Sequence, residues 1–198
     1  MPHATVQPSG NPPRLTSRHI KHLRVVKNRS KLLTLMPSNG IVAEVGVDEG
    51  NYSEKILSIA KPKILHLVDA WGSQRFDEDK FKKIQSRFAA EVERGQVVIH
   101  RGVSWDELQK FPGAYFDWIY LDTSHTYEDT TKELAVSRLK VKPNGLISGH
   151  DYTVGNIKRS LLYGVIHAVN EFCINHGWEM IYLTHEPNRY LSYVLRRT

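Results

Sequence analysis

The chain has 198 residues, of which 40% are hydrophobic and 24% are charged. This composition fits one folded domain and excludes a wholly disordered chain. No apolar run approaches the roughly 20 residues that cross a bilayer, and a single cysteine, Cys173, excludes a disulfide framework and a multi-cysteine zinc site. We therefore expect a cytoplasmic protein without a membrane segment.

The positive charge is concentrated near the N-terminus. The net charge is +6, yet residues 1–43 contain seven Lys or Arg and no Asp or Glu. The other 155 residues carry twenty basic and twenty-one acidic side chains, a net of −1. Because the body of the chain is almost neutral, the net charge by itself does not indicate nucleic-acid binding.

The first 36 residues divide into a tail and an arm. Residues 1–13 hold four of the nine prolines and are expected to be a disordered tail. Residues 14–36 predict a basic helical arm in one or two pieces, with Ser17 and Ser30 as candidate N-caps. An Arg-rich, acid-free start also resembles a transit peptide, but a helix packed on the domain is the favoured interpretation.

Residues 37–198 alternate between strand and helix patterns and form the expected catalytic domain. The expected strands are 41–47, 63–68, 96–100, 116–121, 146–149, 178–183 and 190–195. The expected helices are 52–60, 81–92, 105–111, 127–139 and 157–172, with a turn at 143–145 and Gly177 ending the last helix. Apolar strands separated by helices predict an α/β fold with a parallel sheet covered on both faces, and the last two strands form an antiparallel edge.

The loop after the first strand has the glycine spacing of a ligand site. Gly46 and Gly50 allow a tight turn and a close approach to a ligand at the carboxyl end of the sheet. The spacing G-x-x-x-G differs from the dinucleotide fingerprint, and no Gly-Lys-Ser/Thr follows as in a P-loop. Asp48 and Glu49 would repel a pyrophosphate, so the loop suits a cationic ligand without phosphate. A purely structural glycine turn is the alternative.

The next two strand ends extend this candidate site. Asp69 stands 19 residues after Gly50, the usual distance for a carboxylate that binds a ribose. Its alternative role is to cap the following segment. After the third strand, residues 101–104 could border an adenine ring.

Two further strand ends carry carboxylates and histidines. Asp122 and Asp151 follow the fourth and fifth strands and would converge if those strands are neighbours. Two carboxylates suit Mg²⁺ or another hard cation, and His150 as a ligand would shift the preference toward Mn²⁺, Fe²⁺ or Zn²⁺. His125 could act as a general base. For each histidine, an ordinary solvated loop position is the alternative, since the chain has ten.

Taken together, these strand ends resemble the class I S-adenosylmethionine-dependent methyltransferases. Residues 44–50 are similar to their first motif and Val68-Asp69 to their second. Residues 116–127 and 142–152 resemble the branch that contains macrocin-type O-methyltransferases and cephalosporin-hydroxylase-like proteins, a branch that is commonly metal-dependent. The resemblance implies a Rossmann-like, doubly wound sheet of seven mostly parallel strands, with an antiparallel C-terminal strand and helices on both faces.

The resemblance also implies a role for each matching residue. The cofactor-binding residues would be Glu44, Gly46, Val47, Gly50, Asn51, Ser53, Asp69, Ala70, Trp71, Gly102, Val103, Ser104 and Asp122. Asp122, Asp151 and His150 would hold a divalent metal, and His125 and Asp122 would be catalytic. The branch usually has an acidic residue where this chain has His150.

The function expected on these grounds is metal-assisted O-methylation of a small hydroxylated molecule, such as a sugar or catechol-like ring. One alternative is a metal-dependent hydrolase or hydroxylase that uses the same two carboxylates. A second is an RNA methyltransferase guided by the basic arm, which the neutral body and the absence of an Asn/Asp-Pro-Pro-Tyr/Phe motif argue against. A third is a protein that binds the cofactor without catalysis. The arm could also pack on a second subunit of a homo-oligomer.

Overall fold

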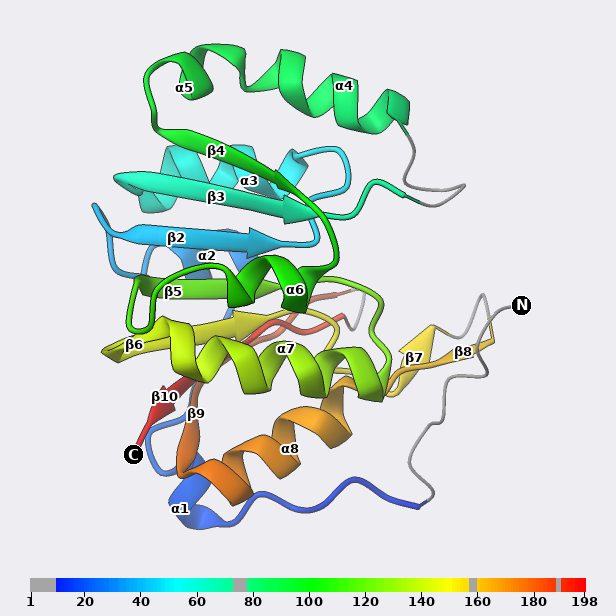
Figure 1. Ribbon diagram of the computed structural model, residues 1–198. Coiled ribbons are helices and arrows are strands. Elements are labelled where there is room, and N and C mark those ends of the chain that lie inside the picture. The colour runs from blue at the N-terminus through cyan, green and yellow to red at the C-terminus, as the bar shows by residue number, and fades with distance from the viewer. Residues whose placement is uncertain (1–9, 73–77, 157–159, 188–189) are drawn as a thin grey trace.

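A computed structural model describes residues 10–72, 78–156, 160–187 and 190–198. Within these residues, eight strands form one sheet in the order β1-β9-β10-β6-β5-β2-β3-β4 (Figure 1). The strands are β1 Arg24–Val26, β2 Ile41–Val45, β3 Ile64–Asp69, β4 Val97–Arg101, β5 Phe116–Leu121, β6 Val141–Gly149, β9 Trp178–Thr184 and β10 Tyr193–Arg197. Strand β10 runs antiparallel to β6 and β9, and the other pairs are parallel.

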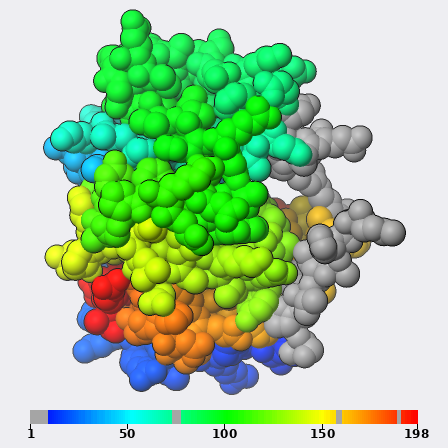
Figure 2. All heavy atoms as spheres, in the orientation of Figure 1, coloured from blue at the N-terminus to red at the C-terminus, as the bar shows by residue number. Residues whose placement is uncertain are grey.

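Helices cover both faces of the sheet (Figure 1). They are α1 Ser17–Ile20, α2 Arg29–Leu33, α3 Asn51–Lys55, the π-helix η1 Ile56–Ala60, α4 Glu78–Arg87, α5 Ala89–Glu93, α6 Ser104–Gln109, α7 Tyr127–Lys140 and α8 Val165–His176. A small hairpin joins β7 Gly155–Asn156 and β8 Leu161–Leu162. Helices α6, α7 and α8 hide one face of the sheet in the space-filling view (Figure 2). None of the described helices combines the length and apolar character needed to span a membrane.

Alternation along the strands explains why both faces are buried. On β2, Val42 packs in the cluster beneath α2 and η1, whereas the next residue, Ala43, packs in the cluster beneath α7 and α8. Neighbouring side chains of a strand point to opposite faces, so a strand of the central sheet must be apolar at consecutive positions. This confirms the α/β fold with a mostly parallel sheet and an antiparallel C-terminal strand.

The sheet has one strand more than the seven expected. The extra strand, β1, comes from the arm at 14–36, which was expected to be helical in one or two pieces, and it pairs in parallel with β9. The arm's two helices are short and begin after Thr16 and Asn28 instead of at caps on Ser17 and Ser30. The Asn28 side chain accepts a hydrogen bond from the Lys31 N–H at 2.9 Å. Of the expected tail, residues 1–9 lie outside the described residues, while the Pro13 carbonyl accepts a hydrogen bond from Asn170.

The helix expected over 157–172 begins later. Residues 157–159 lie outside the described residues, and the segment around them forms the β7–β8 hairpin. Helix α8 begins only after Gly164, where an added Cβ would lie 2.2 Å from the backbone nitrogen of Tyr127. Its end at Gly177, with φ +67, is confirmed. The glycine is required at Gly164 because two backbone segments meet there.

Two other expected elements are irregular. The helix expected over 81–92 is divided into α4 and α5 at Phe88, whose ψ of 18° departs from helical geometry. The turn expected at 143–145 lies inside β6 as a break in register, because Phe116 pairs with Val141 whereas Trp118 pairs with Leu146. Residues 143–145 therefore interrupt the ladder without ending the strand.

A buried histidine pair gives the fold a predicted acid sensitivity. His66 is 5% exposed, and its Nδ1 lies 2.9 Å from Nε2 of His100. Burial, and then the charge of His100, lower the pKa of His66 to about 4. The unfolded chain therefore binds a proton at this site between pH 6.5 and 4 while the folded chain does not, so stability falls as pH falls through that window.

We expect this group to remove up to about 3 kcal/mol of unfolding free energy between pH 6.5 and 4. Urea unfolding at several pH values measures the loss. His66→Leu should lose less stability over the same window than the wild type, whereas His185→Gln, at an exposed position, should match the wild type. Parallel pH profiles for His66→Leu and the wild type would contradict the assignment.

Candidate active site

The loop after β2 is shaped by its glycines. Gly46 has φ +90, and a Cβ there would lie 2.0 Å from the backbone oxygen of Asp122. Its N–H donates to the carbonyl of Val68 at 2.9 Å. Gly50 has φ +75, and a Cβ there would lie 2.7 Å from the ring of Phe88. The loop therefore packs against the ends of β3 and β5 at Gly46 and against the ring of Phe88 at Gly50.

Glu44 lies beneath this loop with its side chain enclosed. It is 1% exposed, and the hydroxyl of Ser53 on α3 donates a hydrogen bond to its carboxyl group. Burial raises the pKa of Glu44 to about 8, although the bond from Ser53 acts in the opposite direction. A buried carboxyl group of this kind becomes ionised when a cation is placed beside it. Glu44 and the glycine cradle therefore fit the cationic methionine end of S-adenosylmethionine.

Asp69 closes the same loop from β3. Its Oδ2 accepts hydrogen bonds from the N–H groups of Val47 and Asp48 at 2.8 and 3.0 Å. Its Oδ1 accepts one from the N–H of Trp71 at 3.1 Å. The capping alternative for Asp69 is thus present in the structure. Each carboxylate oxygen has two lone pairs, so Asp69 can accept further hydrogen bonds from ribose hydroxyls. This role stays a prediction.

The other residues expected around the cofactor divide into two groups. Gly102 donates its N–H to the carbonyl of Asp69 at 3.0 Å, and Val103 and Ala70 are exposed at the same edge. Three side chains instead bind protein partners. Trp71, 1% exposed, donates from Nε1 to the Asp48 carbonyl, Asn51 accepts from Arg87, and Ser104 donates to Glu133. The strand ends lie together as predicted, but the side chains of Trp71, Asn51 and Ser104 bind other protein groups in this structure.

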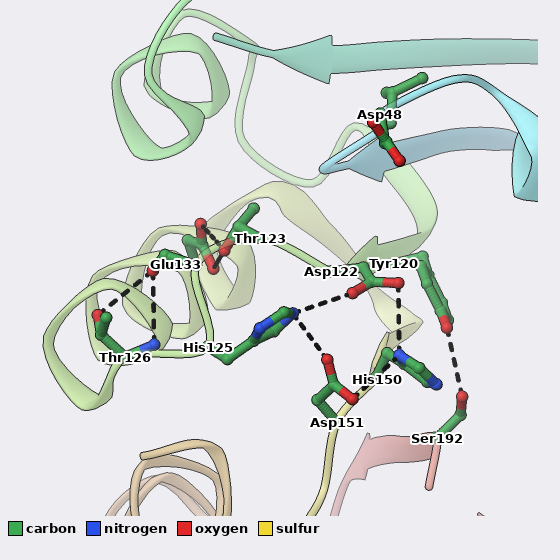
Figure 3. A network of polar contacts seen from close by, with 12 residues as sticks. Asp48, Tyr120, Asp122, Thr123, His125, Thr126, Glu133, His150, Asp151 and Ser192 are labelled. Carbon is green, nitrogen blue, oxygen red and sulfur yellow. Dashed lines mark hydrogen bonds and ion pairs between the residues drawn. The ribbon is translucent and has the colours of Figure 1, made fainter. Parts of the chain in front are cut away.

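The two strand-end carboxylates converge as expected from adjacent parallel strands (Figure 3). Nε2 of His125 lies 3.2 Å from Oδ1 of Asp122 and 2.7 Å from Oδ2 of Asp151. Nδ1 of His150 lies 3.5 Å from Asp122 and 3.4 Å from Asp151. We call these four residues the Asp-His cluster. Asp151 is buried in this cluster, whereas the side chains of Asp122 and His125 remain partly exposed.

Backbone strain accompanies the cluster. His125 has φ +62 and Asp151 has φ +56, which is the left-handed region that residues with a Cβ avoid. Each such residue costs about 1–2 kcal/mol, and strain of this kind concentrates at functional sites. The left-handed turn at His125 folds its ring back between the two carboxylates.

Hydrogen bonding sets the charges in the cluster. Burial alone would lower the pKa of His125 and of His150, but hydrogen bonds to Asp122 and Asp151 outweigh burial and raise each pKa to about 9. Burial alone would raise the pKa of Asp122 and of Asp151, but the bonds from the histidines outweigh it and lower both. At neutral pH the cluster therefore holds two carboxylates and two protonated imidazoles.

The donor atoms of Asp122, His125 and Asp151 all lie within 4.8 Å of one another. His125, expected only as a base, thus stands where a metal ligand would stand, and His150 lies slightly further from both carboxylates. Nε2 of His150 is buried without a hydrogen-bond partner among the described residues. Two carboxylates and an imidazole fit a divalent cation such as Mn²⁺, Fe²⁺ or Zn²⁺ better than Mg²⁺.

Sequence reasoning missed three residues beside the cluster. Arg29, from α2, places Nη1 3.6 Å from Oδ2 of Asp122. The ring of Tyr163 lies 4.7 Å from the ring of His125, centroid to centroid. Glu133, from α7, accepts hydrogen bonds from Thr123, and burial raises its pKa to about 7. Glu133 could have been noticed in the sequence, because it is an acidic residue at a buried helix position. No sequence pattern around Arg29 or Tyr163 indicates that either lies at the site.

A family model described as a methyltransferase domain matches residues 43–152. A search of curated proteins by sequence gives no significant match. Among solved structures, the Bacillus subtilis m1A22 tRNA methyltransferase TrmK is 11% identical with TM-score 0.61, and 87% of this chain and 67% of that chain are covered. The M. jannaschii protein TYW2, solved in complex with AdoMet, is 11% identical with TM-score 0.53, and 93% and 78% are covered.

The pyocyanin biosynthetic protein PhzM is 14% identical with TM-score 0.58. The match covers 81% of this chain and 51% of PhzM, so this chain spans about half the length of that protein. At these identities the solved structures establish the shared fold, whereas the family model covers more than half of the chain. The chain belongs to the methyltransferase-domain family.

Proposed function

We propose that the chain transfers a methyl group from S-adenosylmethionine to a hydroxyl oxygen of a small molecule, with the help of a divalent cation, as in the macrocin-type branch. The observation that carries the proposal is the Asp-His cluster, in which His125 lies within hydrogen-bonding distance of both Asp122 and Asp151. Methyl transfer within this family favours the proposal over the hydrolase or hydroxylase alternative.

The bound cofactor supplies an electrophilic methyl group, which a nucleophile must approach in line. Gly46 and Glu44 would hold the methionine end, because the glycine leaves room at the backbone and the carboxyl group can neutralise an ammonium. Asp69 and the 102–104 loop would border the ribose and adenine. The chain thereby fixes the donor at the carboxyl ends of β2, β3 and β4.

The acceptor hydroxyl needs to lose its proton to become a good nucleophile. Asp122 and Asp151, with the imidazole of His150, would hold a divalent cation, and such a cation lowers the pKa of a bound hydroxyl. His125 would take the proton from its neutral form, and a cation bound by Asp122 and Asp151 would favour that form because it offsets the carboxylate charges that raise the pKa of His125. The ring of Tyr163 beside His125 would form an aromatic wall of the acceptor space, suited to a flat ring or a sugar face.

Isothermal titration of the purified protein with S-adenosylmethionine, alone and with Mn²⁺ or Mg²⁺, tests this proposal, followed by methylation assays on sugars and catechols. We expect micromolar cofactor binding and turnover that is lost with a chelator and restored by the metal. Methylation of a small hydroxyl compound that is indifferent to chelator would contradict the metal's role. No cofactor binding in any condition would contradict the proposal as a whole.

His125→Ala tests the base. General-base residues contribute about 10²–10⁴-fold to rate, so turnover should fall by that range while the Kd for the cofactor stays within about twofold. The exposed His185→Ala is the matched control and should retain full turnover. Wild-type turnover in His125→Ala would reject the assignment.

RNA methylation is the second candidate, and the arm favours it. Arg18, Lys21, Arg24 and Lys27 are all exposed, and exposed cations attract phosphate. If RNA is the acceptor, gel-shift affinity should fall with salt, and replacing these four residues by Gln should abolish the shift. If RNA binding is absent or does not depend on salt, RNA is rejected as the acceptor and the small-molecule proposal remains.

A further inference from the structure

Arg29 enters the active site from outside the segment that the methyltransferase family model covers, residues 43–152. Three contacts hold its backbone in place. Asn28 caps the start of α2, the Arg29 N–H donates to Oε1 of Glu186 at 2.6 Å, and β1, just before it, pairs with β9. The arm therefore delivers this one side chain to the centre of the sheet, although its other basic residues lie on the surface.

The guanidinium of Arg29 has an unusual environment. Its carbon lies 4.9 Å from the ring centroid of Tyr52, and Nη1 lies 3.6 Å from Oδ2 of Asp122. Among the described residues, no carboxylate lies within the 3.5 Å of a hydrogen bond to this guanidinium. The Tyr52 hydroxyl is also buried without a hydrogen-bond partner among those residues. The hydroxyl of Tyr120 is a further hydrogen-bond partner of this guanidinium. Because a guanidinium has five N–H donors and no carboxylate is hydrogen-bonded to this one, it has donors left to bind an added carboxylate.

The charges around Arg29 match a zwitterion. Glu44 and Asp122 supply carboxyl groups at the end of β2 and β5, and Arg29 supplies a fixed cation next to Asp122. An α-amino acid group carries an ammonium and a carboxylate on one carbon, so it needs an acid and a base presented side by side. A metal ion or a neutral acceptor would not need the guanidinium, whereas the methionine end of the cofactor has this pair of charges.

We propose that Arg29 binds the carboxylate at the methionine end of S-adenosylmethionine, while Glu44 and Asp122 face its ammonium. The inference rests on the proposed use of that cofactor and assigns to the arm a role in the reaction. Arg29 is then a specificity residue that distinguishes the cofactor from analogues without the carboxylate. Tyr52 positions the guanidinium through its ring.

The test compares two ligands on four proteins by calorimetry: the wild type and three variants. S-adenosylmethionine and its decarboxylated form differ only in the carboxylate. Charge-assisted hydrogen bonds contribute about 1.5–3 kcal/mol, so Arg29→Gln should weaken binding of S-adenosylmethionine by about 10–100-fold and leave the decarboxylated form within about twofold. Arg29→Lys keeps the charge but loses the fork, so its affinity should lie between. Lys27→Gln, an exposed neighbour, should bind both ligands as the wild type does.

Equal weakening of both ligands by Arg29→Gln would overturn the proposal, because it would show that Arg29 only supports the fold. Unchanged affinity for S-adenosylmethionine would overturn it as well. Failure of the wild type to bind either ligand would overturn the use of the cofactor itself, and with it this assignment. Thermal melting of each variant identifies any that does not fold, and Arg29→Lys then carries the comparison.

Discussion

Replacing Gly46 by alanine is expected to destabilise the fold by at least about 3 kcal/mol and to abolish cofactor binding. The added Cβ would lie 2.0 Å from the backbone oxygen of Asp122, and φ is +90. Backbone cannot move aside as a flexible side chain can, so β2 and β5 would have to separate at their carboxyl ends. Urea unfolding and titration with S-adenosylmethionine measure the two losses.

Gly95→Ala is the matched control, because Gly95 also has a positive φ, +69, but nothing lies within 4 Å of an added Cβ. It should lose only the conformational cost, about 1 kcal/mol, and bind the cofactor normally. If both variants lose the same stability and both bind the cofactor, the contact between Gly46 and Asp122 has no part in the site.

Asp122→Asn is expected to reduce turnover by about 10³-fold or more, since the substitution removes a charge on which the metal and His125 both depend. It would also leave Arg29, His125 and His150 facing one another with one carboxylate fewer. Losing one member of a largely buried ion cluster should cost about 2 kcal/mol or more of stability. Single-turnover kinetics with the unmethylated acceptor and S-adenosylmethionine measures the first effect, and urea unfolding measures the second.

An independent readout comes from the histidines. Hydrogen bonds to Asp122 help to raise the pKa of His125 and of His150 to about 9, so both pKa values should fall in Asp122→Asn when followed by NMR. Asp106→Asn, at an exposed position on α6, should change neither turnover nor these titrations. Full turnover in Asp122→Asn would remove the Asp-His cluster from the mechanism.

The sheet was largely predictable because its signal is local. Strand β5, Phe116–Leu121, has the bounds expected from its apolar run, with five of its six residues buried. The convergence of Asp122 and Asp151 followed from one rule, that neighbouring parallel strands end at the same edge. Residue type and position sufficed there, since a strand buried on both faces leaves few other places for a carboxylate.

The arm was not predictable in the same way. Residues 24–26 form strand β1 only because β9 offers its edge, and the basic side chains around them favoured a surface helix. Such a short strand has little intrinsic preference, so its partner decides its conformation. The position of Arg29 beside Asp122, a residue 93 positions later, depends on that pairing.

The sequence by itself determined the alternation of strands and helices, the glycine loop after β2 and the two strand-end carboxylates, because each depends on burial or turn geometry within a few residues. Only the tertiary structure decided that His125, at φ +62, lies between Asp122 and Asp151. It also placed the ring of Tyr163 against that of His125 and the guanidinium of Arg29 beside Asp122. These contacts join distant segments, and strand order together with strained loop conformations sets them. No local pattern of residues encodes the strand order or these loop conformations.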